Sequence, residues 1–397
     1  MVTRGQIGAL ASRIYPGLDE RLWNRRRDRE MRGEIEAGGY SATLADLPKL
    51  VSNRPSHLVV VPQDGPRAEA WKPGGGNFFY EISQSAREYA GAEKVTVFPI
   101  EPDEPPAVWH ARLIRFLVES GATHVAAHIE SNPNATRDTN TWDTCLSQLK
   151  TRWDGVVLGV IFDSAFEWVT IGARRLARTS PNFMLVDIGL PMNGVLVPGR
   201  FEVGPVNMPI SNESLQVIDD YTAGRQKIYD VTFIGSLYPQ RVELLDHLRA
   251  HGARVAVNPH RPDVTTDFTE SRTNQPSYLD YMSGLAQSNM TLNFSQASAG
   301  PIEQLKTRVL EAAVMGCIVL TDDLDRTRRF FEPELEFGNF ANPRELAEVV
   351  KGFMSDPAKL AAAQQAAKQR ARSINVTSFW GGVEEGLRLR GLPAFKS

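Results

Sequence analysis

Two acids and two cations crowd one short stretch of the chain, EQLKTRVLEAAVMGCIVLTDD at 303–323. Glu303 and Glu311 have seven residues between them, and Lys306 and Arg308 stand in that interval. Cations of this kind hold phosphate groups, and carboxylates accept hydrogen bonds from sugar or ribose hydroxyls. The residue types therefore fit recognition of a sugar diphosphate. The structural alternative is an intrahelical salt bridge between Arg308 and Glu311, which would stabilise a helix by only a few tenths of a kcal/mol.

The same stretch has the pattern of a helix that follows a strand. A helix beginning near Leu305 would end at Gly316 and would turn an apolar stripe toward a sheet, formed by Leu305, Val309, Ala312 and Ala313. Its free N–H groups would lie at the carboxyl end of the strand and would favour an anion there. Lys306 and Arg308 in a first turn oppose the helix dipole, so their presence suggests a bound diphosphate.

The rest of the chain predicts the elements that would position this helix. Short apolar runs rich in β-branched residues predict strands at 57–62, 94–100, 123–129, 156–162, 182–189, 229–235, 253–258, 290–295, 317–323 and 335–340. Helical patterns lie at 78–91, at 107–121 and almost throughout 343–392. Apolar strands that alternate with helices predict parallel sheets covered on both faces.

The 397 residues exceed one ordinary core, so the sequence predicts an α/β protein with two doubly wound, Rossmann-like domains facing across a cleft. Ligands bind such sheets at the carboxyl ends of their strands, and clefts between domains are common sites. The predicted parts are an N-terminal helical extension at 1–55, a first domain at 56–215, a second at 216–375, and a C-terminal helix at 376–397 that could cross back to the first domain.

In the first domain, the candidate site residues follow predicted strands. Gly74 and Gly75 lie in a glycine loop near Lys72, where the backbone can approach a ligand; a flexible surface loop is the alternative. Four further polar side chains stand at or near strand carboxyl ends, where a base or an acceptor of sugar hydroxyl protons would sit: His128, Glu130, Asp163 and Asp187. A helix cap or a core histidine is the ordinary alternative for these.

The spacing of Glu303 and Glu311 resembles the E-x7-E motif of retaining GT-B glycosyltransferases. A longer part of the sequence resembles the CgeB-like (spore-maturation protein) branch of the group 1 glycosyl transferases. This part runs from YDVTFIGSLYPQRVELLDHL through MTLNFSQ and QLKTRVLEAAVMGCIVLTDD to LEFGNFANPRELAEVVKGFMSDP. The resemblance covers about 229–375. It implies a GT-B fold and an enzyme that transfers a hexose, of the kind used in polysaccharide biosynthesis.

Carried over onto this sequence, the resemblance assigns roles to single residues. Glu311 would hold the donor ribose, Glu303 would lie near the donor sugar, and Lys306 and Arg308 would face the diphosphate. It adds a strand-to-helix turn and the helix after it: Gly235, Ser236 and Arg241. This chain departs from the GT-B pattern at 237–240, where Leu, Tyr, Pro and Gln stand instead of a second basic residue. That departure favours Lys306 and Arg308 over Arg241 as phosphate ligands.

The reaction implied is transfer of a sugar from a nucleotide diphosphate donor to a saccharide, lipid-linked, protein or other hydroxyl acceptor, with retention and with no cofactor besides the donor substrate. DDLD at 322–325 resembles a metal-binding DxD motif, but Asp323 or Asp325 there suits a helix cap, so no metal is expected. Two alternatives stay open. One is a GT-B nucleotide-sugar epimerase, and the other is a two-domain binding protein without turnover.

Composition limits the partners. The net charge of −3 gives no general field for nucleic acid, which is not expected as a partner. The arginine cluster at 24–32 reads as a solvated helix face, with a membrane-surface or partner contact as the alternative. No apolar run has the length of a secretory signal or a transmembrane segment, and Cys145 and Cys317 join no metal-binding cluster. The sequence predicts a cytoplasmic protein and is compatible with a homo-oligomer.

Overall fold

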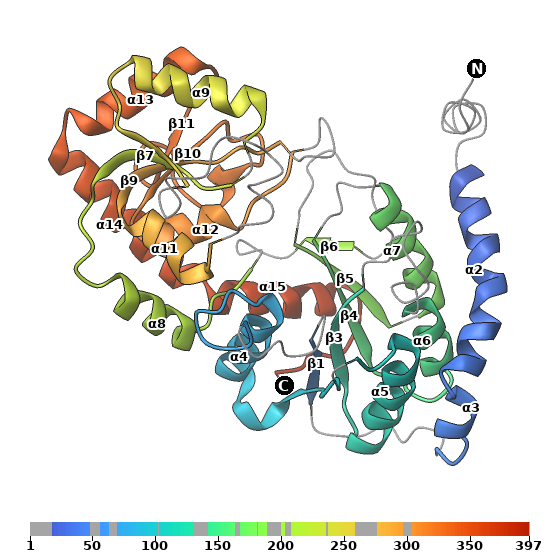
Figure 1. Cartoon of the computed structure of the whole chain (residues 1–397). Helices are drawn as coiled ribbons and strands as arrows, with labels where there is room; N and C mark the ends of the chain where they lie inside the picture. The colour runs from blue at the N-terminus through green and yellow to red at the C-terminus, as the bar shows by residue number, and fades with distance from the viewer. Residues whose placement is uncertain are drawn as a thin grey trace, which may run out of the picture.

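The computed structural model describes residues 18–47, 56–62, 70–101, 103–129, 142–162, 167–180, 182–188, 200–202, 208–235, 237–258, 276–296 and 303–396. Within these residues the chain forms two parallel β-sheets with helices on both faces, one in each half of the sequence (Figure 1). The predicted α/β class with two Rossmann-like domains is confirmed. Each of the ten predicted strands overlaps a strand of the structure.

The first sheet has the strand order β2-β1-β3-β4-β5-β6, and its described pairings are parallel. Its strands are β1 (Leu58–Val61), β2 (Val95–Val97), β3 (His124–His128), β4 (Val156–Ile161), β5 (Phe183–Asp187) and β6 (Arg200–Glu202). The sequence did not predict β6, because this three-residue edge strand, RFE, carries no apolar run.

Alternate residues of the strands face two different helix layers, as the two-residue period of a strand requires. In β1, Leu58 and Val60 belong to the core under α4 (Phe78–Ala90) and α15 (Val376–Leu389), whereas Val59 and Val61 belong to the core under α5, α6 and α7, whose bounds follow. The helices of this half are α2 (Leu18–Ala37), α3 (Tyr40–Thr43), α4 (Phe78–Ala90), α5 (Pro106–Ser120), α6 (Trp142–Leu149) and α7 (Glu167–Thr179), with a 3-10 turn η1 (Ala92–Lys94). Continuous apolar strands are therefore explained by burial on both faces.

The second sheet has the order β11-β10-β9-β7-β8 and is likewise parallel in its described pairings. Its strands are β7 (Tyr229–Phe233), β8 (Val255–Val257), β9 (Ser288–Leu292), β10 (Ile318–Thr321) and β11 (Phe337–Asn339). Its helices are α9 (Pro239–Ala250), α11 (Tyr278–Ala286), α12 (Arg308–Val314), α13 (Pro343–Met354) and α14 (Pro357–Ile374), with a 3-10 turn η3 (Thr327–Arg329). The direction in which successive strands are added reverses at β7, because β8 lies on one side of β7 and β9 lies on the other.

The chain crosses between the two sheets twice, and a pair of hydrogen bonds ties the crossings together. The Ile210 backbone N–H donates to Asn375 Oδ1 at 2.9 Å, and Asn375 Nδ2 donates to the Ile210 carbonyl. Helix α8 (Asn212–Thr222) follows the first crossing and docks on α4, where the buried Glu81 carboxylate accepts from Ser211 N at 2.6 Å and Ser214 Oγ at 2.5 Å. The sequence did not predict α8, which lies in a stretch rich in Pro, Gly and Asn.

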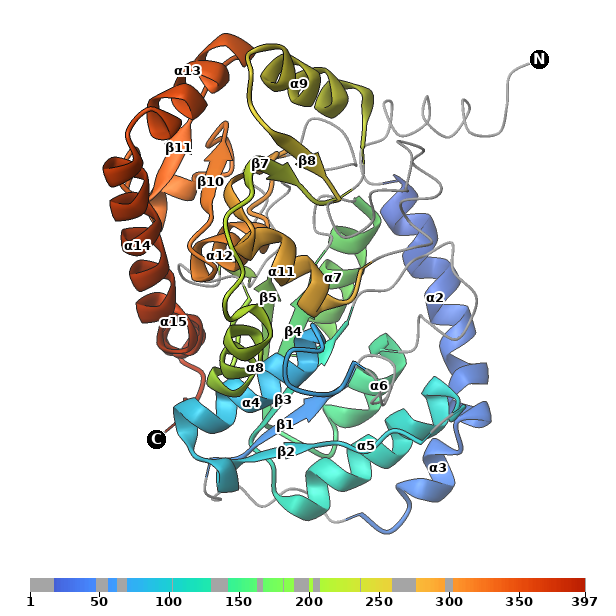
Figure 2. The same cartoon turned by 60° about the vertical axis from the view of Figure 1, so that its left-hand side comes forward.

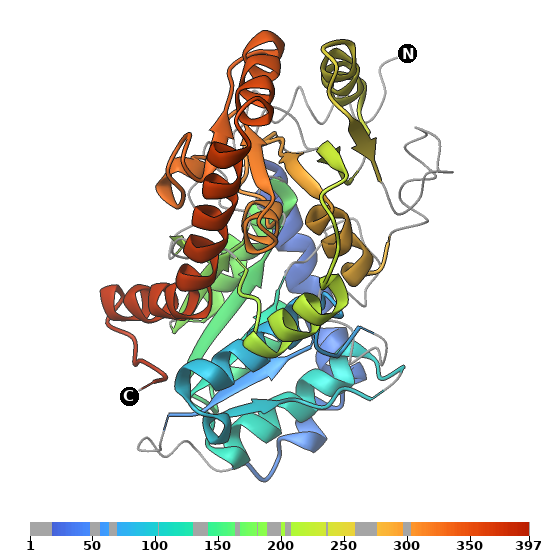
Figure 3. The same ribbon diagram turned by 90° about the vertical axis from the view of Figure 1, so that its left-hand side faces the viewer.

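The last part of the chain returns to the first domain. Helix α15 (Val376–Leu389) packs against α4, and the tail beyond it lies along the same domain (Figures 2 and 3). Phe395 is fully buried, with its ring 5.0 Å from that of Trp380 and 5.9 Å from that of His124. The His124 ring also hydrogen-bonds to the Pro393 carbonyl at 2.8 Å. Residues at the end of the chain thus complete a core that β1 to β5 begin.

The arginine cluster on α2 is not a uniformly solvated face. Arg27 is only 1% exposed, and its guanidinium pairs with Glu34 and Asp143, each at 2.7 Å. Arg175 on α7 reaches the other oxygen of Asp143 at 2.7 Å. Burial lowers the pKa of Arg27, but these carboxylates outweigh it and raise the pKa above its usual value. The prediction of a solvated face was wrong for Arg27, because this side of α2 packs on α6 and α7.

We expect Arg27→Ala to lower the free energy of unfolding by about 3 to 5 kcal/mol, because it leaves buried carboxylates without their cation. The matched control is Arg26→Ala. Arg26 makes an exposed pair with Glu30 one turn away, so its loss should cost less than about 1 kcal/mol. Urea denaturation followed by circular dichroism measures both. Equal effects of the two substitutions would contradict the inferred role of the buried network.

Candidate active site

The second sheet places a turn where open parallel sheets bind ligands. The chain leaves β7 at Ile234 and Gly235 and enters α9, while β9 lies on the other side of β7, so this turn sits at the point where the strand order reverses. Gly235 has a φ of 151°, a conformation that favours glycine, and its N–H donates to Asn258 Oδ1 at 3.0 Å. The predicted strand-to-helix turn is therefore present at Gly235, and Ser236 lies outside the described residues.

Arg308 lies directly against this turn. Its Nη2 donates to the Ile234 carbonyl, and a Cβ atom added to Gly235 would come within 3.1 Å of that nitrogen. The guanidinium carbon is 5.1 Å from the centroid of the Phe233 ring. Nε of Arg308 is buried and has no hydrogen-bond partner among the described residues. Arg308 thus keeps an unused donor beside the Gly235 turn.

Arg241, in the first turn of α9, lies over the same aromatic surface. Its guanidinium carbon is 4.6 Å from the ring centroid of Tyr238, 5.0 Å from that of Phe294 and 5.6 Å from that of Phe233. Burial, and then the positive charge of Arg308, lower the pKa of Arg241 to about 10. Helix α9 begins without a side-chain cap and without an acid in its first turn. The guanidinium groups of Arg241 and Arg308 both lie near the Phe233 ring of β7, and their positive charges repel each other.

Glu311 lies on α12 and is only 5% exposed. Its Oε2 accepts a hydrogen bond from Tyr281 Oη at 2.8 Å and a longer one from Thr307 Oγ1 at 3.4 Å. Burial raises the pKa of Glu311, and the Tyr281 hydrogen bond and the charge of Arg308 oppose that rise. The intrahelical salt bridge considered from the sequence is not formed, because Arg308 donates to Ile234 instead.

Helix α12 begins at Arg308, three residues later than predicted. Gln304 N donates to Ser295 O at 2.9 Å, and Gln296 and Glu303 form an antiparallel bridge. These contacts keep 303–304 extended beside the chain leaving β9, so the helix cannot start there. Lys306 therefore precedes the helix, and its Nζ donates to Gln304 Oε1 at 2.7 Å. With only seven residues, α12 has a short dipole, and the positive charge at the turn comes from side chains.

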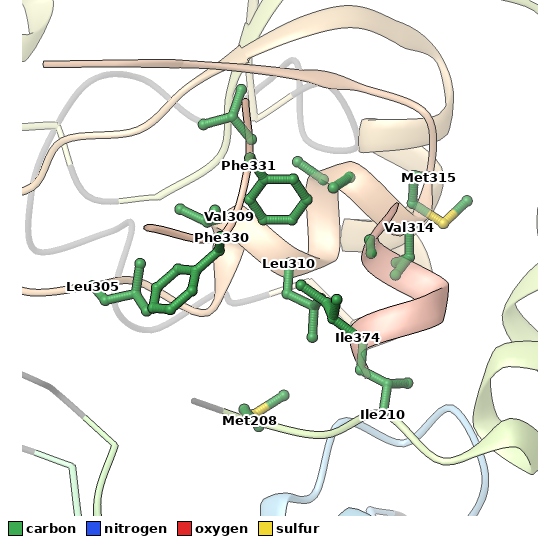
Figure 4. Close-up of a cluster of buried hydrophobic side chains, with 14 of the residues drawn as sticks. Met208, Ile210, Leu305, Val309, Leu310, Val314, Met315, Phe330, Phe331 and Ile374 are labelled. Atoms are coloured by element: carbon green, nitrogen blue, oxygen red, sulfur yellow. The ribbon is translucent and has the colours of Figure 1, made fainter. Parts of the chain in front are cut away.

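The residues of the predicted apolar stripe are buried, although Leu305 precedes α12 and does not lie on it. Leu305, Val309, Ala312 and Ala313 are all buried, and Gly316 ends the segment with a φ of 60°. Figure 4 shows Val309, Leu310 and Val314 in one apolar cluster with Phe330, Phe331 and Ile374. This packing fixes one side of α12 and so fixes the polar residues on the other.

The glycine loop of the first domain packs against the second domain. Gly74 N donates to Ser214 Oγ at 3.0 Å, and a Cβ on Gly74 would lie 3.0 Å from Leu279. A Cβ on Gly76 would lie 2.7 Å from the ring of Tyr278, and one on Gly75 would lie 2.4 Å from the Ala70 carbonyl. The loop is therefore closely packed against α8 and α11. Its contact with a ligand stays a prediction.

The remaining first-domain candidates lie at strand ends. His128 ends β3, half-buried, with its ring 5.1 Å from that of Phe162 and 6.3 Å from that of Phe79. Asp187 ends β5 and is 1% exposed. Glu130 and Asp163 lie outside the described residues. The structure thus gathers Gly235, Arg241, Arg308 and Glu311 in the second domain. His128 lies apart from them, at the carboxyl end of β3 in the first sheet.

The acids of DDLD hold a turn together. Asp323 accepts from Arg328 N at 2.9 Å, and Asp325 accepts from Thr327 N at 3.1 Å and from Thr327 Oγ1 at 2.7 Å. Burial, aided by the neighbouring acids, raises the pKa of Asp325 to about 6. The N-cap of η3 is Arg326, so neither Asp323 nor Asp325 takes the predicted cap position, although both accept hydrogen bonds from residues of η3. No group of three or more metal-ligating side chains occurs among the described residues.

A hollow of about 790 Å³ lies elsewhere, between α2 and the start of α5. Its lining includes Arg26, Arg29 and Glu30 of α2 and 105–108 at the start of α5. Among the residues that the structure describes, no predicted site residue lines this hollow. We place the candidate site at the Gly235 turn, because unused donors and concentrated charge point to a ligand more strongly than volume alone.

Comparison with known proteins gives one family match. Residues 231–376 match the model of a family described as glycosyl transferase-like. Residues 231–376 therefore resemble a glycosyl transferase-like domain. The matched segment contains Gly235, Arg241, Arg308 and Glu311. No curated protein matches the sequence, and nothing in the match distinguishes the CgeB-like branch.

Solved structures show what the whole chain resembles in fold. An α-glucosyltransferase in complex with UDP-glucose and DNA containing an abasic site aligns with a TM-score of 0.57 at 11% identity, over 85% of this chain and all of that one. An α-glucosyltransferase in complex with UDP aligns with a TM-score of 0.56 at 10% identity over the same shares. The fold is that of the GT-B glycosyltransferases.

The sequence analysis missed two tyrosines that lie beside Glu311 in the second domain. Tyr278 and Tyr281 on α11 lie beside Glu311, three positions apart and so on one face of the helix. The tyrosine spacing was visible in the sequence, but its partner was not, because α11 and α12 are separated by β9 and a long connection. No helix in the described part of the chain is both long enough and apolar enough to span a membrane.

We expect Gly76→Ala to lower the free energy of unfolding by more than the strain of its backbone alone. Gly76 has a φ of 72°, which costs an alanine about 1 kcal/mol, and the new methyl group would also press on the Tyr278 ring. Gly224→Ala is the control, because Gly224 has a φ of 73° and nothing within 4 Å of the added atom. Thermal denaturation compares the two. Equal losses would show that the loop does not press on α11.

Proposed function

We propose that the protein is a glycosyltransferase that moves a sugar from a nucleotide diphosphate donor to a hydroxyl group of a saccharide, lipid-linked or protein acceptor. One observation carries the proposal: Arg241 and Arg308 converge on Phe233 beside Gly235, where Arg308 keeps an unused buried donor. Two cations held this close repel each other, and a diphosphate between them would relieve that repulsion.

In the proposed reaction, the bond between the anomeric carbon and the diphosphate oxygen breaks. A new bond forms between that carbon and the acceptor oxygen, and the acceptor proton passes to the departing diphosphate. Arg308, Arg241 and the Gly235 turn stabilise the charge that develops on the leaving group. Glu311 holds the donor ribose. Proton transfer to the leaving group itself needs no separate base, which is compatible with retention and with metal-independent transfer.

The other candidate residues receive roles in the same reaction. Lys306 and Glu303 stand before α12, where a cation could reach the diphosphate and a carboxylate could accept hydrogen bonds from the donor sugar. His128, Asp163, Gly74 and Gly75 are proposed to contact the acceptor or the reacting groups from the first domain. Ser236 is proposed to bind phosphate beside Gly235. Closure of the cleft would exclude water from the oxocarbenium-like centre.

The family match supports transfer over the two alternatives. An epimerase on the same fold would bind the donor but would need no acceptor, whereas the matched family is described as glycosyl transferase-like. A binding protein without turnover would keep the donor site and lose only the reaction. UDP is the first donor nucleotide to test, since the solved α-glucosyltransferases of similar fold contain UDP or UDP-glucose.

We expect one nucleotide diphosphate, UDP first, to raise the melting temperature of the wild type without added metal. At one hundred times its dissociation constant the ligand stabilises the fold by about 2.7 kcal/mol. Glu311→Ala and Arg308→Ala should each remove most of this shift, because they delete the ribose acceptor and a diphosphate donor group. Thermal denaturation against UDP, GDP, ADP, CMP and their sugar conjugates makes the measurement.

Arg254→Ala is the control for this experiment. Arg254 pairs with Asp230 at the amino ends of β7 and β8, the opposite edge of the sheet from the Gly235 turn, and should keep the ligand shift. A wild type that responds to none of the nucleotides would sink the proposed function. If the ligand still raises the melting temperature of both site variants, the donor binds somewhere other than the Gly235 turn. Donor binding without sugar transfer to any acceptor would favour the binding protein.

A further inference from the structure

Tyr281 provides the shorter hydrogen bond to the buried carboxylate of Glu311. Its hydroxyl donates to Oε2 at 2.8 Å, and the only other hydrogen bond to Glu311 within the described residues, from Thr307, is 3.4 Å long and ends on the same oxygen. Neither of these two bonds ends on Oε1. A carboxylate has about four acceptor positions, so one oxygen can be fixed by the protein while the other receives a ligand hydroxyl.

The neighbouring Tyr278 makes a different contact. It stands on the same face of α11, one turn before Tyr281, and its ring packs against the glycine loop at Gly76. Its buried hydroxyl approaches the Glu311 carboxyl and lowers the pKa of that carboxyl less than Tyr281 does, but it forms no well-aligned hydrogen bond within the described residues. Of the two tyrosines, Tyr281 therefore has the stronger hold on Glu311.

We propose that Tyr281 is a positioning residue that holds Glu311 oriented and ionised for the ribose of the donor. The inference rests on the proposed function, because it deepens the role given there to Glu311. A protonated carboxyl group has one oxygen engaged as a hydroxyl, so it accepts fewer hydrogen bonds from a diol than a carboxylate does. A hydrogen-bond donor directed at the ionised carboxylate favours the ionised form of that group inside a buried site.

The charges around Glu311 agree with this role. Burial raises the pKa of Glu311, and the Tyr281 hydrogen bond is the largest of the influences that lower it, followed by the charge of Arg308 on the same helix. On α11, Asp280 is engaged with Tyr221 and Ser277. On α14, which also packs on α12, Lys368 lies beside Gly316 at the far end. The negative charge of Glu81 on α4 contributes to the raised pKa of Tyr278.

The test is the pH dependence of UDP affinity in wild type, Tyr281→Phe and Tyr278→Phe, measured by calorimetry. Without the Tyr281 hydroxyl the pKa of Glu311 should rise further, so Glu311 would be more protonated near neutral pH. At pH 6.5 we expect the dissociation constant of Tyr281→Phe to be about tenfold above wild type. Raising the pH to 8.5 should restore ionisation and recover most of the affinity. Tyr278→Phe should follow the wild-type profile within about twofold.

A double-mutant cycle separates positioning from a general packing role. In Glu311→Gln, which cannot titrate, the further change Tyr281→Phe should leave the pH profile flat and weaken binding much less than it does beside Glu311. Affinity lost equally at both pH values would overturn the inference, as would a Tyr281→Phe chain that does not fold. If the wild type binds UDP and Tyr281→Phe binds it identically, the inference fails while the proposed function stands. If the wild type binds no nucleotide, the proposed function fails first.

Discussion

The joint between Ile210 and Asn375 is the constraint on which the arrangement of the two domains depends. Asn375 uses its side-chain amide to satisfy both the N–H and the carbonyl of Ile210, as a neighbouring strand would. Both crossings between the sheets pass through this contact. Because Asn375 also separates α14 from α15, any change in the angle between the domains must be absorbed at or near it.

The candidate site takes its charge from contacts that cross elements. Arg308 comes from α12, Arg241 from α9 and Phe233 from β7, and they meet because parallel strands end at one edge of a sheet. The Gly235 turn lets these groups approach the backbone. Both arginines stand at the start of a helix, and their guanidinium groups stack on an aromatic surface that β7 supplies.

The sequence was sufficient for ten of the eleven described strands and for the apolar residues of α12, because both follow periods of burial that a chain displays locally. It was insufficient wherever a partner lay far along the chain. From the sequence alone Arg27 is expected to be solvated, because its partner Asp143 is far along the chain. Tyr281 is likewise expected to be a packing residue, because the sequence does not show that Glu311 lies beside it. The start of α12 was misplaced for the same reason, since a hydrogen bond from Gln304 to Ser295 keeps the residues before it extended.

The burial of Phe395 has a consequence for the order of folding. Its ring fills the core of the first domain together with Trp380 and beside His124 at the start of β3. During synthesis β1 to β5 leave the ribosome long before these residues, so the domain made first cannot close its core until residue 395 has emerged. Until then its face toward α15 stays exposed to other chains, a state that favours aggregation or help from a chaperone.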